Sequence, residues 1–251
     1  MSRQVCRAAL HWSGGKDSAM ALSALIDEKV HDACGRDVVL DRLVTTVHSD
    51  RNTSTVHGVP VELLAAQADS IGLPLETIPL PGPGLDGYAE AMAATARRLR
   101  SEGIEAFAFG DLSSSGVLRR KQAQFAPFGI EVLVPLWGQS SQEVIARFLR
   151  SGLAAVTIVV DASVLDRSDV GVPLDGDFLA RLPDGVDVCG ELGEYHSFVH
   201  DGPIFGRHVP FHLDEPRFLE RVIGTTEGPR RFAYWLATPQ PGRDEGGTAD
   251  P

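Results

Sequence analysis

The 251-residue chain has few cysteines and no long apolar run, and each shortage excludes a class of protein. Its three cysteines, Cys6, Cys34 and Cys189, are odd in number and widely spaced, which favours reduced thiols over a disulfide framework. No apolar run approaches the roughly 18 residues that a membrane-spanning helix requires. The N-terminal residues lack a signal-peptide core, so we expect a cytoplasmic protein with no membrane partner.

Positive charge is also scarce. The chain has 23 basic and 34 acidic residues, a formal net charge of −11, and only three of the basic residues are lysines. Such a balance repels polyanions and argues against a nucleic-acid partner. The negative net charge is still compatible with a phosphate ligand, because backbone N–H groups and one lysine can bind a small anion locally.

Short apolar stretches alternate with longer amphipathic ones through the first half of the chain. They predict strands at 5–10, 38–47, 75–80, 106–109 and 131–134, and helices at 18–29, 59–71, 88–100 and 119–125. This alternation predicts an α/β fold, a Rossmann-like parallel sheet with helices on both faces. Pro79 favours an edge position or a strand end for the third of these strands. Ligands of such sheets bind beyond the carboxyl ends of the strands.

The segment Ser13-Gly14-Gly15-Lys16-Asp17-Ser18 lies between the first predicted strand and the first predicted helix. Its glycines allow an anion to approach the backbone, and a helix N-terminus favours a phosphate there. The two serines can donate hydrogen bonds, and Lys16 adds a positive charge. Asp17 indicates either a magnesium ligand or a helix cap. The segment resembles the PP-loop of the ATP pyrophosphatases, which cleave ATP between the α and β phosphates.

The alternation stops at Pro135–Gly138, where we place a domain boundary. Residues 1–136 would form the PP-loop ATP-binding domain, 137–237 a smaller C-terminal α+β domain, and 238–251 a disordered tail. A helix at 140–150 and a strand at 154–160 are expected to be followed by short elements. Residues 155–205 contain ten acids and two arginines, so the second domain is acidic.

A second motif runs from Cys189 to Val199 and contains Glu191, Glu194, Tyr195 and His196 between glycines. Such a set could position a polar substrate or perform acid–base chemistry; from the residues alone, a glycine-rich hairpin with solvated acids is equally consistent. If 195–199 is extended, Tyr195 and Ser197 share one face and His196 the other.

The second motif is similar to the Gly-Glu-x-Gly-Glu-Tyr/Phe-His-Thr/Ser motif of the diphthine–ammonia ligase family. Further matches extend the resemblance in order over residues 8–210: Trp12, 43–46, 57–59, 109–111, 135–137 and 201–205. The resemblance implies an active site between two domains and the reaction of ATP, diphthine and ammonia to diphthamide, AMP and pyrophosphate. The cofactors would be ATP and Mg²⁺.

The resemblance also implies roles for individual residues. ATP would be bound by Trp12, Ser13, Gly14, Gly15, Lys16, Asp17, Ser18 and His48, with Asp17 the candidate Mg²⁺ ligand. The acceptor would be bound by His57, Gly190, Glu191, Gly193, Glu194, Tyr195 and Ser197. The catalytic residues would be Lys16, Asp111, Glu191, Glu194 and His196.

The sequence leaves alternatives for the acceptor and for the overall function. The arginine-over-lysine bias and the chain length favour a bacterial source, whereas diphthine belongs to archaeal and eukaryotic elongation factor 2; the acceptor is then either diphthine or another carboxylate. After Asp111 the sequence also lacks the acidic residue that the family usually has near an arginine. A tRNA-modifying PP-loop enzyme is disfavoured by the net charge and the absence of C-x-x-C. A non-catalytic nucleotide-binding protein is a further alternative for the function. A homodimer is an alternative for the oligomeric state.

Overall fold

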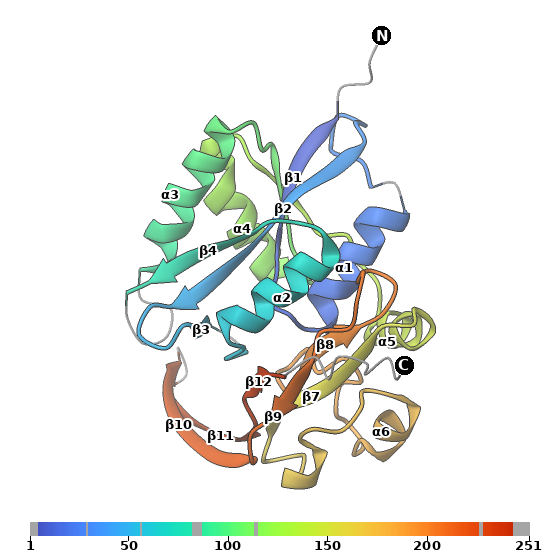
Figure 1. Cartoon of the computed structure of the whole chain (residues 1–251). Helices are drawn as coiled ribbons and strands as arrows, with labels where there is room; N and C mark the ends of the chain where they lie inside the picture. The colour runs from blue at the N-terminus through green and yellow to red at the C-terminus, as the bar shows by residue number, and fades with distance from the viewer. Residues whose placement is uncertain are drawn as a thin grey trace, which may run out of the picture.

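The computed structural model describes residues 5–28, 30–55, 57–81, 87–112, 115–225 and 228–242, which form two large sheets, one above the other, and a small two-stranded sheet (Figure 1). The strands of the first sheet are β1 (Cys6–His11), β2 (Val38–His48), β3 (Thr53–Ser54), β4 (Leu75–Leu80), β5 (Ala106–Ala108) and β6 (Glu131–Leu133). They follow the order β3-β2-β1-β5-β6, and β4 pairs with β2. All pairs are parallel except β2 with β3.

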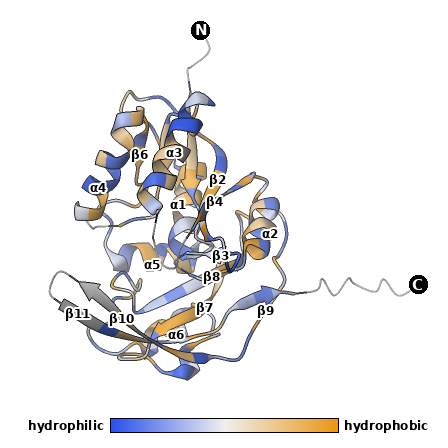
Figure 2. Cartoon of the chain, turned by 90° about the vertical axis from the view of Figure 1, so that its left-hand side faces the viewer, coloured by the Kyte–Doolittle hydropathy of each residue, from blue (hydrophilic) through white to orange (hydrophobic). Residues whose placement is uncertain are grey.

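Helices cover both faces of the first sheet, as the sequence predicts. They are α1 (Lys16–Asp27), α2 (Val61–Ile71), α3 (Tyr88–Ser101) and α4 (Ser115–Phe125). Alternation along β1 explains the two faces: Ala8 and Leu10 join the core that contains α1 and α2, whereas Ala9 joins the core of α3 and α4. Figure 2 shows hydrophobic residues on the strands between these helices. The predicted Rossmann-like α/β fold is therefore confirmed.

The edge position expected from Pro79 is also confirmed. Among the described residues, β4 pairs with β2 alone, in parallel register from Leu75 opposite Leu43 to Leu80 opposite His48. Proline has no N–H to donate, so the outer edge of a sheet tolerates it.

The second sheet is antiparallel and has the order β10-β11-β7-β8. Its strands are β7 (Ala154–Asp161), β8 (Tyr195–Asp201), β10 (Arg217–Thr225) and β11 (Gly228–Leu236), while β9 (Phe211–Leu213) pairs with β12 (Pro239–Pro241). Two helices accompany it, α5 (Ser141–Arg150) and α6 (Gly176–Arg181), and single 3-10 turns lie at Ala126–Phe128 and Arg167–Asp169. Within the described ranges no helix is both long and apolar enough to cross a bilayer.

Two expectations for the C-terminal region are wrong. Strands β10 and β11 each have nine residues, because their cross-strand pairing continues through a region whose glycines and prolines had suggested short elements. The tail does not begin at 238: Pro239 is buried and supplies an apolar anchor, and β12 pairs with β9. The remainder of the predicted tail, 243–251, lies outside the described residues.

The two sheets share one hydrophobic core. The cluster that contains Ala8 and Leu10 of β1 also contains Ile158 of β7 and Phe198 of β8. The chain passes from the first sheet to the second between β6 and β7, where Pro135–Gly138 interrupts the sequence pattern. The domain boundary at 136 stays a prediction, since the shared core joins the two parts.

Candidate active site

The loop from β1 to α1 is tightly packed at its two glycines. Gly14 has φ +81°, and a Cβ added there would lie 2.8 Å from Leu64 and 2.9 Å from Gln67. A Cβ at Gly15 would lie 2.9 Å from the backbone oxygen of Ser197. The two glycines therefore let helix α2 and strand β8 approach the loop.

Hydroxyl groups and a helix N-terminus surround this loop. The Ser18 hydroxyl donates to the Gly15 carbonyl at 2.9 Å and lies 3.1 Å from the Ser13 hydroxyl. Helix α1 starts at Lys16, and Gly15 at its N-cap provides no side-chain cap. Backbone N–H groups at such a terminus favour an anion.

Strand β8 of the second sheet is hydrogen-bonded directly to this loop. The Lys16 N–H donates to the Ser197 hydroxyl at 3.1 Å, and the Val199 N–H donates to the Gly14 carbonyl at 2.9 Å. The buried Gln67 of α2 joins them, because its amide nitrogen donates to the carbonyls of Gly14 at 3.1 Å and Val199 at 2.5 Å. The loop is therefore held between the two sheets.

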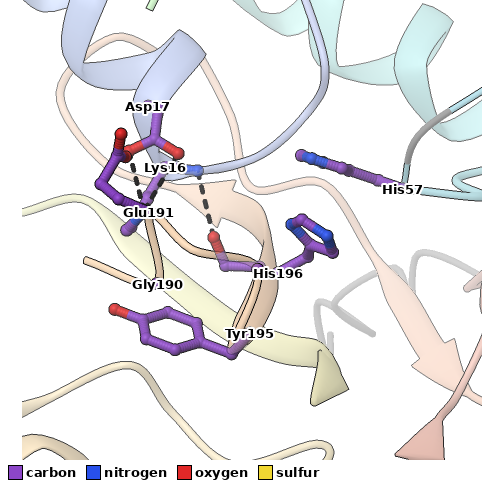
Figure 3. Close-up of a pocket in the computed structure, with 9 residues that line it drawn as sticks. Lys16, Asp17, His57, Gly190, Glu191, Tyr195 and His196 are labelled. Atoms are coloured by element: carbon purple, nitrogen blue, oxygen red, sulfur yellow. Dashed lines mark hydrogen bonds and ion pairs between the residues drawn. The ribbon is translucent and has the colours of Figure 1, made fainter. Parts of the chain in front are cut away.

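A cavity of about 190 Å³ lies where the loop meets β8 (Figure 3). It is lined by Lys16, Asp17, His57, Gly190, Glu191, Gly193, Tyr195, His196 and Ser197. The Lys16 ammonium is almost fully buried, bonds Asp17 at 2.7 Å and lies 5.5 Å from the centre of the Tyr195 ring. Burial alone would lower the pKa of Lys16, but the negative charge of Asp17 and its neighbours raises it, so this amine keeps its proton.

The strand alternation expected for β8 is seen around Lys16. Tyr195 and Ser197 both contact Lys16, whereas His196 stacks on His57 with ring centroids 4.5 Å apart. Burial, and next the charge of Lys16, lower the pKa of His196 to about 4. Burial also lowers the pKa of His57, with a further contribution from His196. Both imidazoles are therefore neutral at pH 7 and can accept a proton or a hydrogen bond.

Glu191 is the carboxylate with the most perturbed acidity in this cavity. Burial, and next the charge of Asp17, raise the pKa of Glu191 to about 7. Its proton occupancy thus changes near neutral pH, where a general acid or base is most effective.

A second cavity of about 200 Å³ lies at the carboxyl ends of β1 and β5. It shares Asp17, His57 and Glu191 with the first cavity and adds His11, Ser13, Ser18, Phe109, Gly110, Asp111 and Lys121. Lys121 forms an ion pair with Asp111 and lies 4.0 Å from the centre of the Phe109 ring. A Cβ at Gly110 would lie 2.7 Å from the Asp17 carbonyl, so glycine allows β5 to end against α1.

A third cavity, of about 380 Å³, shares His57 and His196 with the first. His48, which was predicted to bind ATP, lies here and not in the cavity that contains Ser13, Ser18 and Asp111. It ends β2, next to the turn that leads to β3.

The three cavities bring together most of the predicted site residues, but not Trp12, Gly14, Gly15 and Glu194. Trp12 is fully buried and its indole N–H donates to Gln67 at 2.8 Å. Gly14 contacts α2 and β8. Glu194 is buried, and its two oxygens accept from the N–H groups of Asp187 and Leu192 at 3.1 and 2.9 Å, which closes the 187–194 turn.

Among the site residues that sequence reasoning missed are His11 and Gln67. His11 lines the second cavity, and its position at the carboxyl end of the first strand was the available signal. Gln67 holds the loop, and its signal was a polar side chain on the apolar face formed by Leu63, Leu64 and Ala68.

The fold and the loop together define a class: an α/β protein with a PP-loop sequence between its first strand and first helix. Residues 6–123 match the family described as diphthamide synthase N-terminal domain. The chain is 26% identical to the diphthine–ammonia ligase of Bos taurus and 27% to that of Homo sapiens, each over 224 residues that cover 81% of this chain and 82% of the relative. The corresponding ligase of Danio rerio is 24% identical over 217 residues. The chain is therefore similar to the diphthine–ammonia ligases, the family that its motifs predicted.

Proposed function

We propose that this protein is an ATP-dependent carbon–nitrogen ligase that joins ammonia to a carboxylate acceptor. The observation that carries the proposal is that the PP-loop and the 190–197 motif, far apart in sequence, line one cavity. In the proposed reaction a carboxylate oxygen attacks the α-phosphorus of ATP and pyrophosphate leaves. Ammonia then attacks the acyl carbon, loses a proton and displaces AMP. Diphthine, the substrate in the relatives' name, or another carboxylate would be the acceptor.

The PP-loop residues would bind the phosphates of ATP. Lys16 keeps its positive charge through its contact with Asp17 and would offset the charge on the leaving pyrophosphate. The N-terminus of α1 and the hydroxyls of Ser13 and Ser18 would bind the remaining oxygens. The second cavity, between the ends of β1 and β5, would hold the rest of the nucleotide.

Magnesium fits this site as a partner of the nucleotide. Among the described residues no three metal-ligating side chains converge on one point. The charge of Asp17 helps to raise the pKa of Glu191, which shows excess negative charge beside the loop. Since Mg²⁺ uses one or two carboxylates together with substrate phosphates, Asp17 would hold it and it would supply positive charge there.

Glu191 and His196 are the proposed proton acceptors when ammonia attacks. Glu191 has a pKa of about 7, and neutral His196 lines the same cavity. Glu194 is a weaker candidate because backbone N–H groups occupy both of its oxygens.

The test is Lys16→Met, with the charge-matched control Arg150→Met on the exposed end of α5. The purified proteins would receive ATP, Mg²⁺, ammonium and a panel of carboxylates, and the nucleotide products would be separated. We expect AMP and pyrophosphate from the wild type and the control, and a rate lower by about 10²–10³ for Lys16→Met, the usual loss when one charge-stabilising donor is removed. Equal rates for both variants, or ADP as the product, would refute the proposal.

A further inference from the structure

The third cavity leads away from the PP-loop toward the second sheet. Its walls are the 48–58 segment, which includes β3, and residues of β7, β10 and β11. Figure 1 shows the β10–β11 hairpin beneath β3. The cavity meets the first one at the stacked rings of His57 and His196, so a molecule bound in it could extend one end to the phosphate loop.

The lining of this cavity is basic. Its positive charge comes from Arg51 and Arg217, and no carboxylate is found among the described residues that line it; three histidines, of which His57 and His196 are neutral, and several hydroxyl groups complete the lining. Arg217 donates to a neutral partner, the Thr238 hydroxyl, at 3.4 Å. Arg51 lies 3.5 Å from Asp50, but both side chains are more than half exposed, so water weakens that pair.

Two polar atoms at this cavity have no protein partner. The Nδ1 atoms of His48 and His57 are buried and lack a hydrogen-bond partner within the described part of the chain. His48 lines the third cavity alone, whereas His57 lines all three cavities and its Nδ1 lies on the side of Gly15, 3.3 Å from a Cβ added there. Buried polar atoms are nearly always paired in native proteins, so the Nδ1 of His48 indicates a ligand of the third cavity that carries a hydrogen-bonding group.

We infer that the third cavity binds the acceptor, and that this acceptor is a small molecule with a second negatively charged group remote from the reacting carboxylate. The inference rests on the proposed function and specifies its substrate class. Arg217 and Arg51 would bind the remote anion, and the reacting carboxylate would pass His57 and His196 to reach Lys16. A quaternary ammonium group, as in diphthine, would meet two guanidinium groups and no carboxylate. The volume of about 380 Å³ suits a compact ligand.

The experiment compares two probes of equal chain length and opposite remote charge, glutarate and 4-(trimethylammonio)butanoate. Calorimetric titrations would use the full-length protein with Mg²⁺ and α,β-methylene-ATP, which resists cleavage at the α–β bond. The variants are Arg217→Gln and Arg51→Gln. The control is Arg167→Gln, which removes the same charge from an exposed arginine that pairs with Glu215 outside the cavity.

We expect glutarate to bind the wild type at least tenfold more tightly than the ammonium probe. Arg217→Gln should remove most of that preference, and Arg167→Gln should keep it. Tighter binding of the ammonium probe, no binding of glutarate, or equal effects of the three substitutions would overturn the inference. Weaker binding of α,β-methylene-ATP to Arg217→Gln would also overturn it, because the cavity would then hold the nucleotide.

The two proposals fail in different ways. Formation of ADP instead of AMP, with glutarate still bound through Arg217, would refute the ligase chemistry and leave the anion site standing. AMP formed with a trimethylammonium acceptor, together with no glutarate binding, would refute the anion site alone.

Discussion

Replacement of Gln67 by leucine should destabilise the protein more than any exposed substitution, although Gln67 is not predicted to touch a substrate. The side chain is fully buried and its amide makes three hydrogen bonds, to Trp12, Gly14 and Val199. Leucine leaves the Trp12 indole N–H unpaired, at a cost of about 1–3 kcal/mol, and removes two bonds to carbonyls worth about 0.5–1.5 kcal/mol each. The expected loss is about 2–6 kcal/mol, a large share of the roughly 5–15 kcal/mol that stabilises a typical domain.

Urea unfolding followed by circular dichroism would measure this loss. The control is Gln240→Leu. The Gln240 side chain makes one hydrogen bond, to the exposed carboxylate of Asp214, so its loss should change the free energy of unfolding by no more than about 0.5 kcal/mol. The double variant Trp12→Phe with Gln67→Leu removes the unpaired indole N–H. Its loss of unfolding free energy should therefore be smaller than the sum of the losses of the two single variants. Equal destabilisation by Gln67→Leu and Gln240→Leu would refute the reasoning.

Two more substitutions test the geometry and charge of the loop region. Gly110→Ala places a Cβ 2.7 Å from the Asp17 carbonyl, so it should weaken binding of α,β-methylene-ATP at least tenfold; Gly116→Ala, where a Cβ meets nothing within 4 Å, is the control in the same titration. Glu191→Gln addresses pH dependence. The pKa of Glu191 is about 7 in the folded state against an ordinary 4.5, so the folded protein holds a proton that the unfolded chain releases between those values. The free energy of unfolding of the wild type should therefore fall as pH rises through this window. In urea unfolding, the stability of Glu191→Gln relative to the wild type should be greater at pH 8 than at pH 5. A constant difference at both pH values would contradict the assignment.

The sequence was most informative where local pattern decides structure. Strand and helix periods located the first sheet because each element of an α/β unit buries its own apolar face, as Ala8, Ala9 and Leu10 of β1 do on alternate sides. The glycines of the PP-loop were found because their steric need is local. The 190–197 motif required resemblance, since the same residues also suit an ordinary hairpin.

Contacts between distant segments could not be predicted in the same way. The pairing of β12 with β9 and the length of β10 and β11 depend on cross-strand partners that no local window contains. The engagement of Glu194 with backbone N–H groups and the burial of Trp12 against Gln67 also emerge only when the chain is folded. His48 was placed correctly at the end of a strand, but its cavity also depends on β7, β10 and β11, which lie more than 100 residues away in the sequence.

Strand β8 contributes to two cavities with consecutive residues, since Ser197 is hydrogen-bonded to the PP-loop while its neighbour His196 lines both the first and the third cavity. Side chains on a strand alternate, so a shift of one residue in the pairing of β8 with β7 would exchange these two positions at once. If the two cavities bind nucleotide and acceptor as proposed, recognition of both depends on a single register, and an insertion or deletion within 195–199 would abolish both together. A new acceptor preference would then evolve more easily through the walls contributed by the 48–58 segment and β10 than through β8 itself.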